Sequence, residues 1–145
     1  MIFSKATIYG IRAMTRLATQ PVGSSCGLRE IATAEQIPPD YLRKVLSELR
    51  RHHLIRAARG IHGGYALAGD PNQVTLWDVF RVLEPEPELE SCLLGHDGCD
   101  AQSDCPLYED WQQIREKLLA LLKNKTISQL AENSHYPHSL PGNAA

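Results

Sequence analysis

Residues 28–67 read LREIATAEQIPPDYLRKVLSELRRHHLIRAARGIHGGYAL, and this stretch decides the fold. Its apolar residues recur at helical spacing in two short runs separated by a proline-containing turn. Pro39 and Asp40 mark the start of the second helix, because proline fits the first helical turn and the helix dipole favours an acid there. The residues on the inner faces are Leu28, Ile31, Ala32, Ile37, Leu42, Val45, Leu46 and Leu49. Residues 28–53 therefore predict a helix-turn-helix.

The next residues predict a small β-hairpin. Two short extended pieces within residues 55–68 flank a glycine-rich turn that contains Gly60, Gly63 and Gly64. A hairpin directly behind the second helix of a helix-turn-helix is the wing of a winged helix. Arg59 lies at the base of the turn, where the glycines would let the backbone approach a phosphate or a minor groove closely.

The remaining chain predicts further helices and one polar loop. Residues 4–18 have a helical apolar pattern with Ser4 as N-cap, and Thr75 and Thr126 each begin a capping box before a short helix. Residues 108–123 carry a wide apolar stripe that needs a partner surface, which we expect to be a second subunit. The predicted class is mainly α, a winged helix-turn-helix with a long C-terminal dimerisation helix.

The predicted organisation has four parts. Residues 1–84 form the DNA-binding domain, and residues 85–107 form a cysteine-rich loop, called the cysteine loop below. Residues 108–133 hold the dimerisation helix and a short terminal helix, and residues 134–145 form a disordered tail.

Charge is strongly divided along the chain. Residues 1–68 contain ten Lys and Arg against four Asp and Glu, a balance of +6, whereas residues 69–145 contain five against thirteen, a balance of −8. A basic half of this kind is typical of a nucleic-acid-binding surface. No apolar run approaches the roughly 18 residues of a membrane span, and the N-terminus has no signal-peptide pattern. We therefore expect a cytoplasmic protein.

The cysteine loop holds three of the four cysteines, Cys92, Cys99 and Cys105, within fourteen residues. Glycines and acids separate them, so the segment is neither a helix nor a core strand. In the cytoplasm, clustered thiols more often bind metal or sense redox state than form stable disulfides. Three thiolates suit an iron–sulfur cluster, which normally takes four ligands. Candidates for the fourth are His96 or Asp97, the partner subunit, a small thiol or water.

Other interpretations of the loop remain open. Zinc could be held by the same cysteines with a histidine or an acid, although the spacing lacks C-x-x-C pairs. Two cysteines could instead form a reversible disulfide without metal, although the loop's acids disfavour thiolates. We predict no enzyme, because nothing resembles a substrate-pocket framework, a nucleophile elbow or a phosphate loop.

The assembled motifs resemble the Rrf-type winged-helix transcriptional regulators, the family of IscR-like and NsrR-like iron–sulfur regulators. The wing RGIHGGYAL at residues 59–67 resembles the family pattern R-G-x-x-G-G-Y-x-L. Other family-like features are the cysteine trio and several short motifs: Ser4-Lys5 with Tyr9, Tyr41-Leu42, Leu49-Arg50, Val74-Thr75-Leu76, Asp78-Val79 and Leu83-Glu84. The resemblance covers about residues 1–132.

The resemblance implies a homodimer that binds a pseudo-palindromic operator in double-stranded DNA, with half-sites about one helical turn apart. It also implies an iron–sulfur cluster, of [2Fe–2S] or [4Fe–4S] type, that controls DNA binding in response to iron, redox state, oxygen or nitric oxide. Residues 39–44 would enter a major groove, and Arg59 with its glycines would lie at a minor groove. The predicted DNA-contacting residues are Lys5, Pro39, Asp40, Tyr41, Arg43, Lys44, Arg50, Arg51, Arg59, His62, Gly63 and Gly64.

The chain departs from this family at the cluster. Six residues separate Cys92 from Cys99, where the family has five. Tyr108 stands where some members carry a histidine ligand, and Ile8 stands where others carry an acid from the partner. Neither side chain is a cluster ligand, so the fourth ligand and the cluster type stay open.

Overall fold

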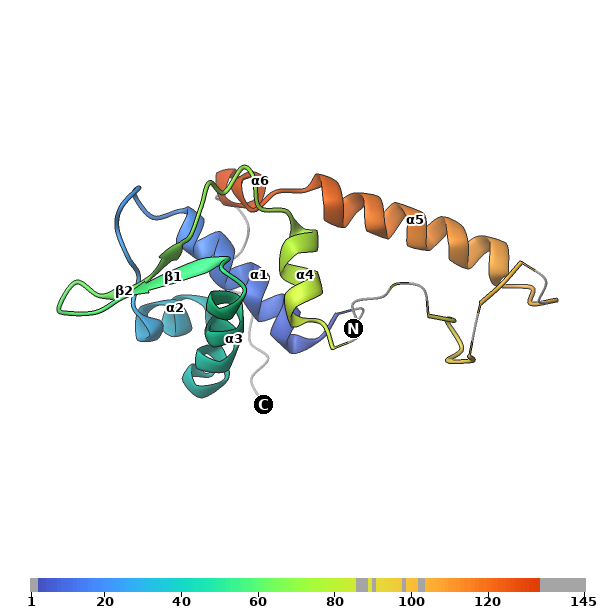
Figure 1. The fold of residues 1–145 in the computed structure, drawn as a ribbon, viewed down its shortest axis with the longest axis horizontal. Coiled ribbons are helices and arrows are strands. Elements are labelled where there is room, and N and C mark those ends of the chain that lie inside the picture. The colour runs from blue at the N-terminus through green and yellow to red at the C-terminus, as the bar shows by residue number, and fades with distance from the viewer. Residues whose placement is uncertain (1–2, 86–88, 90, 98, 102–103, 134–145) are drawn as a thin grey trace.

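The computed structural model describes residues 3–85, 89, 91–97, 99–101 and 104–133. The predicted disordered tail and parts of the cysteine loop lie outside these residues. In chain order the elements are α1 (Lys5–Ala18), α2 (Leu28–Glu35), α3 (Pro39–Arg51), β1 (Ile55–Ala58), β2 (Gly64–Leu67), α4 (Leu76–Leu83), α5 (Tyr108–Asn124) and α6 (Ile127–Glu132). Helices α1 to α4, α6 and the hairpin form one body, from which α5 extends as a long arm (Figure 1).

The helix-turn-helix is formed by α2 and α3. Gln36 ends α2 in the left-handed conformation, with a φ of 53°, and this turns the chain so that Ile37 is buried at 3% exposure. Pro39 occupies the first turn of α3, where its missing N–H costs no helical hydrogen bond. The inward face of α3 is buried as predicted and consists of Leu42, Val45, Leu46 and Leu49.

The wing is an antiparallel pair in which Ile55 faces Leu67 and Ala58 faces Gly64. A third segment supports it, because Cys26 and Tyr65 exchange two backbone hydrogen bonds of 2.8 Å. Gly64 is required at this contact. Its φ is +146°, and a Cβ there would lie 2.6 Å from the carbonyl oxygen of Cys26.

The C-terminal part returns to the body through α6. Both predicted capping boxes are present, at Thr75 with Asp78 and at Thr126 with Gln129. Thr75 and Thr126 also form a β-bridge to each other, which holds the start of α4 against the start of α6. Ile127 is completely buried and packs in the same core as α1. The sequence predicted this short helix without its packing partner.

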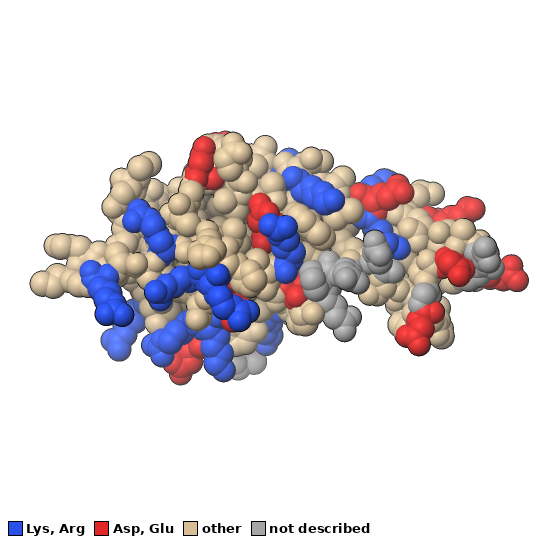
Figure 2. All heavy atoms as spheres, viewed as in Figure 1, with Lys and Arg blue, Asp and Glu red and all other residues tan. Residues whose placement is uncertain are grey.

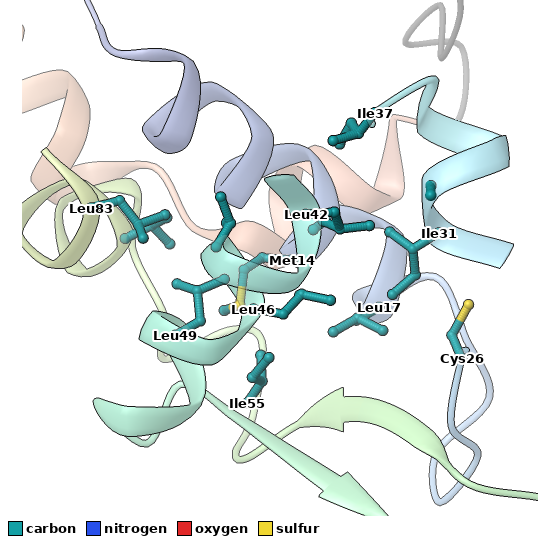
Figure 3. Packing of buried hydrophobic residues seen from close by; sticks show 14 of the residues in the cluster. Met14, Leu17, Cys26, Ile31, Ile37, Leu42, Leu46, Leu49, Ile55 and Leu83 are labelled. Carbon is teal, nitrogen blue, oxygen red and sulfur yellow. The ribbon is translucent and has the colours of Figure 1, made fainter. Parts of the chain in front are cut away.

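One hydrophobic core joins these elements. Met14, Leu42, Leu46 and Leu49 are completely buried, and residues from α1, α2, α3, β1, α4 and α6 surround them (Figure 3). Cys26 is also completely buried and packs in this core. The mainly helical body with its two-stranded hairpin is a winged helix, which confirms the predicted fold class. In the described part of the chain, no helix is long and apolar enough to cross a membrane.

Candidate DNA interface and cysteine loop

The outward face of α3 is basic and exposed. Arg43, Lys44, Arg50 and Arg51 are all exposed there. Arg43 pairs with Asp40 at 3.4 Å and Arg51 pairs with Glu48 at 2.7 Å, both between side chains in contact with water. Because such exposed pairs contribute only about 0–1 kcal/mol, they do not prevent these arginines from turning to a phosphate. Pro39 and Asp40 are exposed at the start of the same helix.

Tyr41 is fixed by a neighbour on α1. Its ring meets the ring of Tyr9 edge to face, with centroids 5.4 Å apart, and 39% of Tyr41 remains exposed. Lys5, exposed at the first residue of α1, lies one helical turn before Tyr9. The contact therefore relates the position of α1 directly to the outward face of α3.

The turn of the wing is exposed beside the loop between α1 and α2. Arg59 and His62 are exposed, whereas Gly63 and Gly64 are partly buried. The hydroxyl of Ser25 donates to the carbonyl oxygen of His62 over 2.6 Å, which braces the turn. The predicted DNA-contacting residues of α3 and the wing thus lie on elements that contacts with α1 and with the loop before α2 hold in place.

Charge separates on the surface as the sequence predicts. Lys and Arg gather over α2, α3 and the hairpin, whereas Asp and Glu predominate towards the outer end of α5 (Figure 2). Two basic residues of α1 are used internally, because Arg12 and Arg16 approach the carboxylate of Glu35 at 3.3 and 4.0 Å. Glu35 is only 2% exposed. Composition alone did not reveal this buried ion pair between α1 and α2.

A carboxylate joins the end of α4 to the start of α1. Glu84 accepts from the backbone N–H of Ser4 at 3.1 and 3.3 Å and from the hydroxyl of Thr7 at 2.7 Å. Ser4 also caps α1 in the predicted way, since its hydroxyl accepts from the N–H of Thr7. Glu84 directly precedes the cysteine loop, so the loop begins from a residue fastened to α1.

Backbone N–H groups of the cysteine loop approach the Cys92 sulfur, and the N–H of Leu94 donates to it over 3.4 Å. The side chain of Cys99 interacts with Cys92, and both are partly exposed. Backbone N–H groups of His96 and Leu94 point at the Cys92 sulfur and, with smaller contributions from Gly95 and Cys99, lower the pKa of this thiol. Lowering the pKa favours the thiolate, which is the metal-binding and nucleophilic form. The acids of the loop were expected to disfavour thiolates, but at Cys92 the backbone N–H groups outweigh them.

The three cysteines do not form a ready metal site. Among the described residues, no group of three or more His, Cys, Asp or Glu side chains is arranged to hold an ion. Cys92, Cys99 and Cys105 are free thiols, and the side chains of His96 and Asp97 are exposed. The soft donors nevertheless suit an iron–sulfur cluster in their chemistry. Cys26, by contrast, lies in the core, where burial raises the pKa of its thiol to about 11.

The loop is attached to α5 by side chains that the sequence did not reveal. The indole N–H of Trp111 donates to the carbonyl oxygen of Ser91 over 3.0 Å, and the amide nitrogen of Gln112 lies 3.9 Å from the Cys99 sulfur. Trp111 fits the apolar stripe, which gave no signal of its polar role. Further along α5, Ile114 and Leu121 are 54% and 49% exposed, so part of the stripe has no cover within the described chain.

Residues 3–133 match the family Rrf2, described as iron-dependent transcriptional regulators. The chain belongs to the Rrf2 family. It is a DNA-binding transcriptional regulator, as the sequence predicted, and the relatives are named as regulators, not enzymes.

Known proteins similar to this Rrf2 member include the regulator IscR of Cronobacter sakazakii, which is 27% identical over 86% of this chain and 76% of its own. The structure of CymR, the global cysteine regulator of Bacillus subtilis, is 27% identical, with a TM-score of 0.74 over 89% of this chain and 95% of its own. An oxidized form of CymR from Staphylococcus aureus is 28% identical, with a TM-score of 0.72 over 91% and 97%.

Proposed function

We propose that this Rrf2 regulator is a homodimer whose cysteine loop holds an iron–sulfur cluster through Cys92, Cys99 and Cys105, and that the cluster controls operator binding. The proposal rests on three free thiols in one polar loop that is attached to both α1 and α5. A bound cluster would supply chemistry that responds to iron supply, oxygen, nitric oxide or redox state. We place the protein in the cytoplasm, where thiols stay reduced.

The donor set supports this proposal in two respects. Backbone N–H groups favour the thiolate of Cys92, and Cys99 also contributes to lowering the pKa of this thiol. Soft thiolates are the ligands that iron–sulfur clusters use. The candidates for the fourth ligand are His96, Asp97 and a group from outside the chain. Neither exposed side chain is preferred by its position in the loop.

The cluster is tested on protein purified without oxygen. We expect a brown solution with iron and acid-labile sulfide, and we expect Cys99→Ala to remove the colour while the winged helix stays folded. Cys26→Ala is the matched control, because this fourth cysteine is buried in the core and should leave the colour intact. Colourless protein with stoichiometric zinc and no sulfide would overturn the cluster.

A thiol switch is the second candidate, favoured by the lowered pKa of Cys92, to which Cys99 contributes. Two electrons and two protons would pass from the thiols to an oxidant such as a peroxide, leaving a disulfide between the two sulfurs. Oxidised protein would then contain a Cys92–Cys99 disulfide and neither iron nor sulfide. Mass spectrometry of non-reduced peptides, beside the metal analysis, separates the two candidates.

The DNA contacts are part of the same proposal. By its place on the wing, Arg59 would contact a minor groove, and Arg59→Ala should weaken operator binding by about 1–3 kcal/mol. Lys117→Ala removes the same charge from the exposed surface of α5 and should leave affinity nearly unchanged. Equal affinities of the two variants across a salt series would remove the wing from the interface.

A further inference from the structure

The contact between α5 and Cys99 runs through a pair of side chains one helical turn apart. Gln112 approaches the Cys99 sulfur with its amide nitrogen at 3.9 Å, and Arg115 donates from Nη1 to the amide oxygen of Gln112 over 3.2 Å. Gln112, Arg115 and Cys99 are all partly buried. The three residues therefore form a hydrogen-bonded row from α5 to the cysteine loop.

The hydrogen-bonding chemistry of arginine fixes the orientation of the Gln112 amide. A guanidinium group has donors and no acceptor, so the amide oxygen of Gln112 must face Arg115. The amide nitrogen must then face Cys99, where it can only donate. Arg115 thus acts on Cys99 through Gln112, by setting which end of the amide meets the sulfur.

Arg115 carries a second, independent sign of a binding function. Its Nε is buried and has no hydrogen-bond partner within the described chain. A buried N–H of a charged group that lacks an acceptor is costly, because it has given up its water without a replacement. A positive group with a spare buried donor, one hydrogen bond away from a thiol, fits an anionic group bound at that thiol.

We propose that Gln112 is a positioning residue for the Cys99 sulfur and that Arg115 orients it, so that α5 itself fixes and tunes one ligand of the cluster. This inference rests on the proposed function, in which Cys99 is a ligand. An N–H that donates to a ligand sulfur stabilises the more negative, reduced state and raises the reduction potential. The same hydrogen bond ties the state of Cys99 to the helix whose exposed apolar stripe we assign to the partner subunit.

The hydrogen bond is tested first in protein without cluster. The side-chain amide resonances of Gln112, followed by nitrogen-15 NMR, should shift in Cys99→Ala and stay in place in Cys105→Ala. Resonances that do not respond to Cys99→Ala would overturn the contact. This result decides the hydrogen bond whether or not the protein binds iron.

The tuning is tested on cluster-loaded protein. Gln112→Glu keeps the size and helix preference and still accepts from Arg115, but its carboxylate cannot donate to sulfur. We expect a more negative midpoint potential than in wild type, and a smaller shift in the same direction for Arg115→Met. Gln113→Leu, on the exposed neighbour, is the matched control and should leave the potential unchanged.

The outcomes separate this inference from the function on which it rests. Unchanged potentials in Gln112→Glu, or equal shifts in Gln112→Glu and Gln113→Leu, would overturn the tuning role. If Gln112→Glu fails to load, Gln112→Leu, which is neutral and also lacks the donor, takes its place with the same expected direction. Wild-type protein that retains no iron and sulfide would overturn the cluster itself, and the amide resonances would still decide the hydrogen bond.

Discussion

Glu84→Ala should lower the free energy of unfolding by about 2–3 kcal/mol. The carboxylate of Glu84 accepts from the hydroxyl of Thr7 at 2.7 Å and from the N–H of Ser4 at 3.1 and 3.3 Å. Hydrogen bonds to a charged group contribute about 1.5–3 kcal/mol each. Thr7 is completely buried, so water cannot replace the lost acceptor, whereas Ser4 is partly exposed and can recover part of its loss. The Thr7 bond therefore accounts for most of the expected effect.

Glu84→Gln provides the graded comparison. Its amide oxygen can still accept from Thr7, so the loss should be limited to the charge beside the N-terminus of α1, which contributes about 0.3–1 kcal/mol. Glu116→Ala removes an exposed carboxylate from α5 and controls for net charge. The expected order of stability is wild type, equal to Glu116→Ala, then Glu84→Gln, then Glu84→Ala.

The assay is urea unfolding of reduced, cluster-free protein, followed by far-ultraviolet circular dichroism. Several protein concentrations are needed, because the proposed dimer would add a concentration-dependent contribution to stability. If Glu84→Ala unfolds at the same urea concentration as Glu116→Ala, the carboxylate does not secure α1. If Glu84→Gln is as unstable as Glu84→Ala, the charge dominates, and the hydrogen bond to Thr7 does not secure α1.

Three further predictions concern other contacts. Gly64→Ala should destabilise the fold by about 1–3 kcal/mol in urea unfolding, because its Cβ would meet the Cys26 carbonyl oxygen at 2.6 Å; wild-type stability would contradict this. Leu121→Asp should convert the proposed dimer to a folded monomer in sedimentation equilibrium, since a charge would enter the exposed apolar stripe, and an intact dimer would place the interface elsewhere. Tyr9→Leu should cost about 0.5–1.5 kcal/mol through loss of the ring contact with Tyr41, and a calorimetric unfolding temperature equal to that of wild type would refute the contact.

Local features of the fold could be predicted because each depends on neighbouring residues. Pro39 begins α3, and the capping boxes at Thr75 and Thr126 begin α4 and α6, since these signals act within one helical turn. The return of α6 to α1 could not be predicted in this way. Periodicity shows that Ile127 needs burial but does not identify the surface that buries it.

The candidate site was predictable to a similar depth. The thiols and the basic residues follow from residue type and spacing, whereas the partners of the loop do not. Gln112 and Arg115 are residue types common on helix surfaces, so the sequence does not mark them. Only the fold brings Gln112 to Cys99 and Arg115 to Gln112. The sequence likewise does not mark Glu35, whose role depends on α1 placing Arg12 and Arg16 against it. Such roles depend on pairs of residues far apart along the chain or across a loop, which one sequence does not relate.

Two attachments of the cysteine loop suggest how a change in it could reach DNA. One end is fastened to α1 through Glu84, and α1 carries Tyr9 against Tyr41 on α3. Inside the loop, Cys99 is attached to α5 through Gln112. The coupling free energy between two sites is typically about 1–3 kcal/mol. The hydrogen bonds of Glu84 contribute a similar free energy to stability. A displacement of the loop therefore need not unfold anything to alter DNA binding. In the proposed homodimer, shifting α1 and α5 relative to each other would move Tyr41 and change the spacing of the two subunits on an operator.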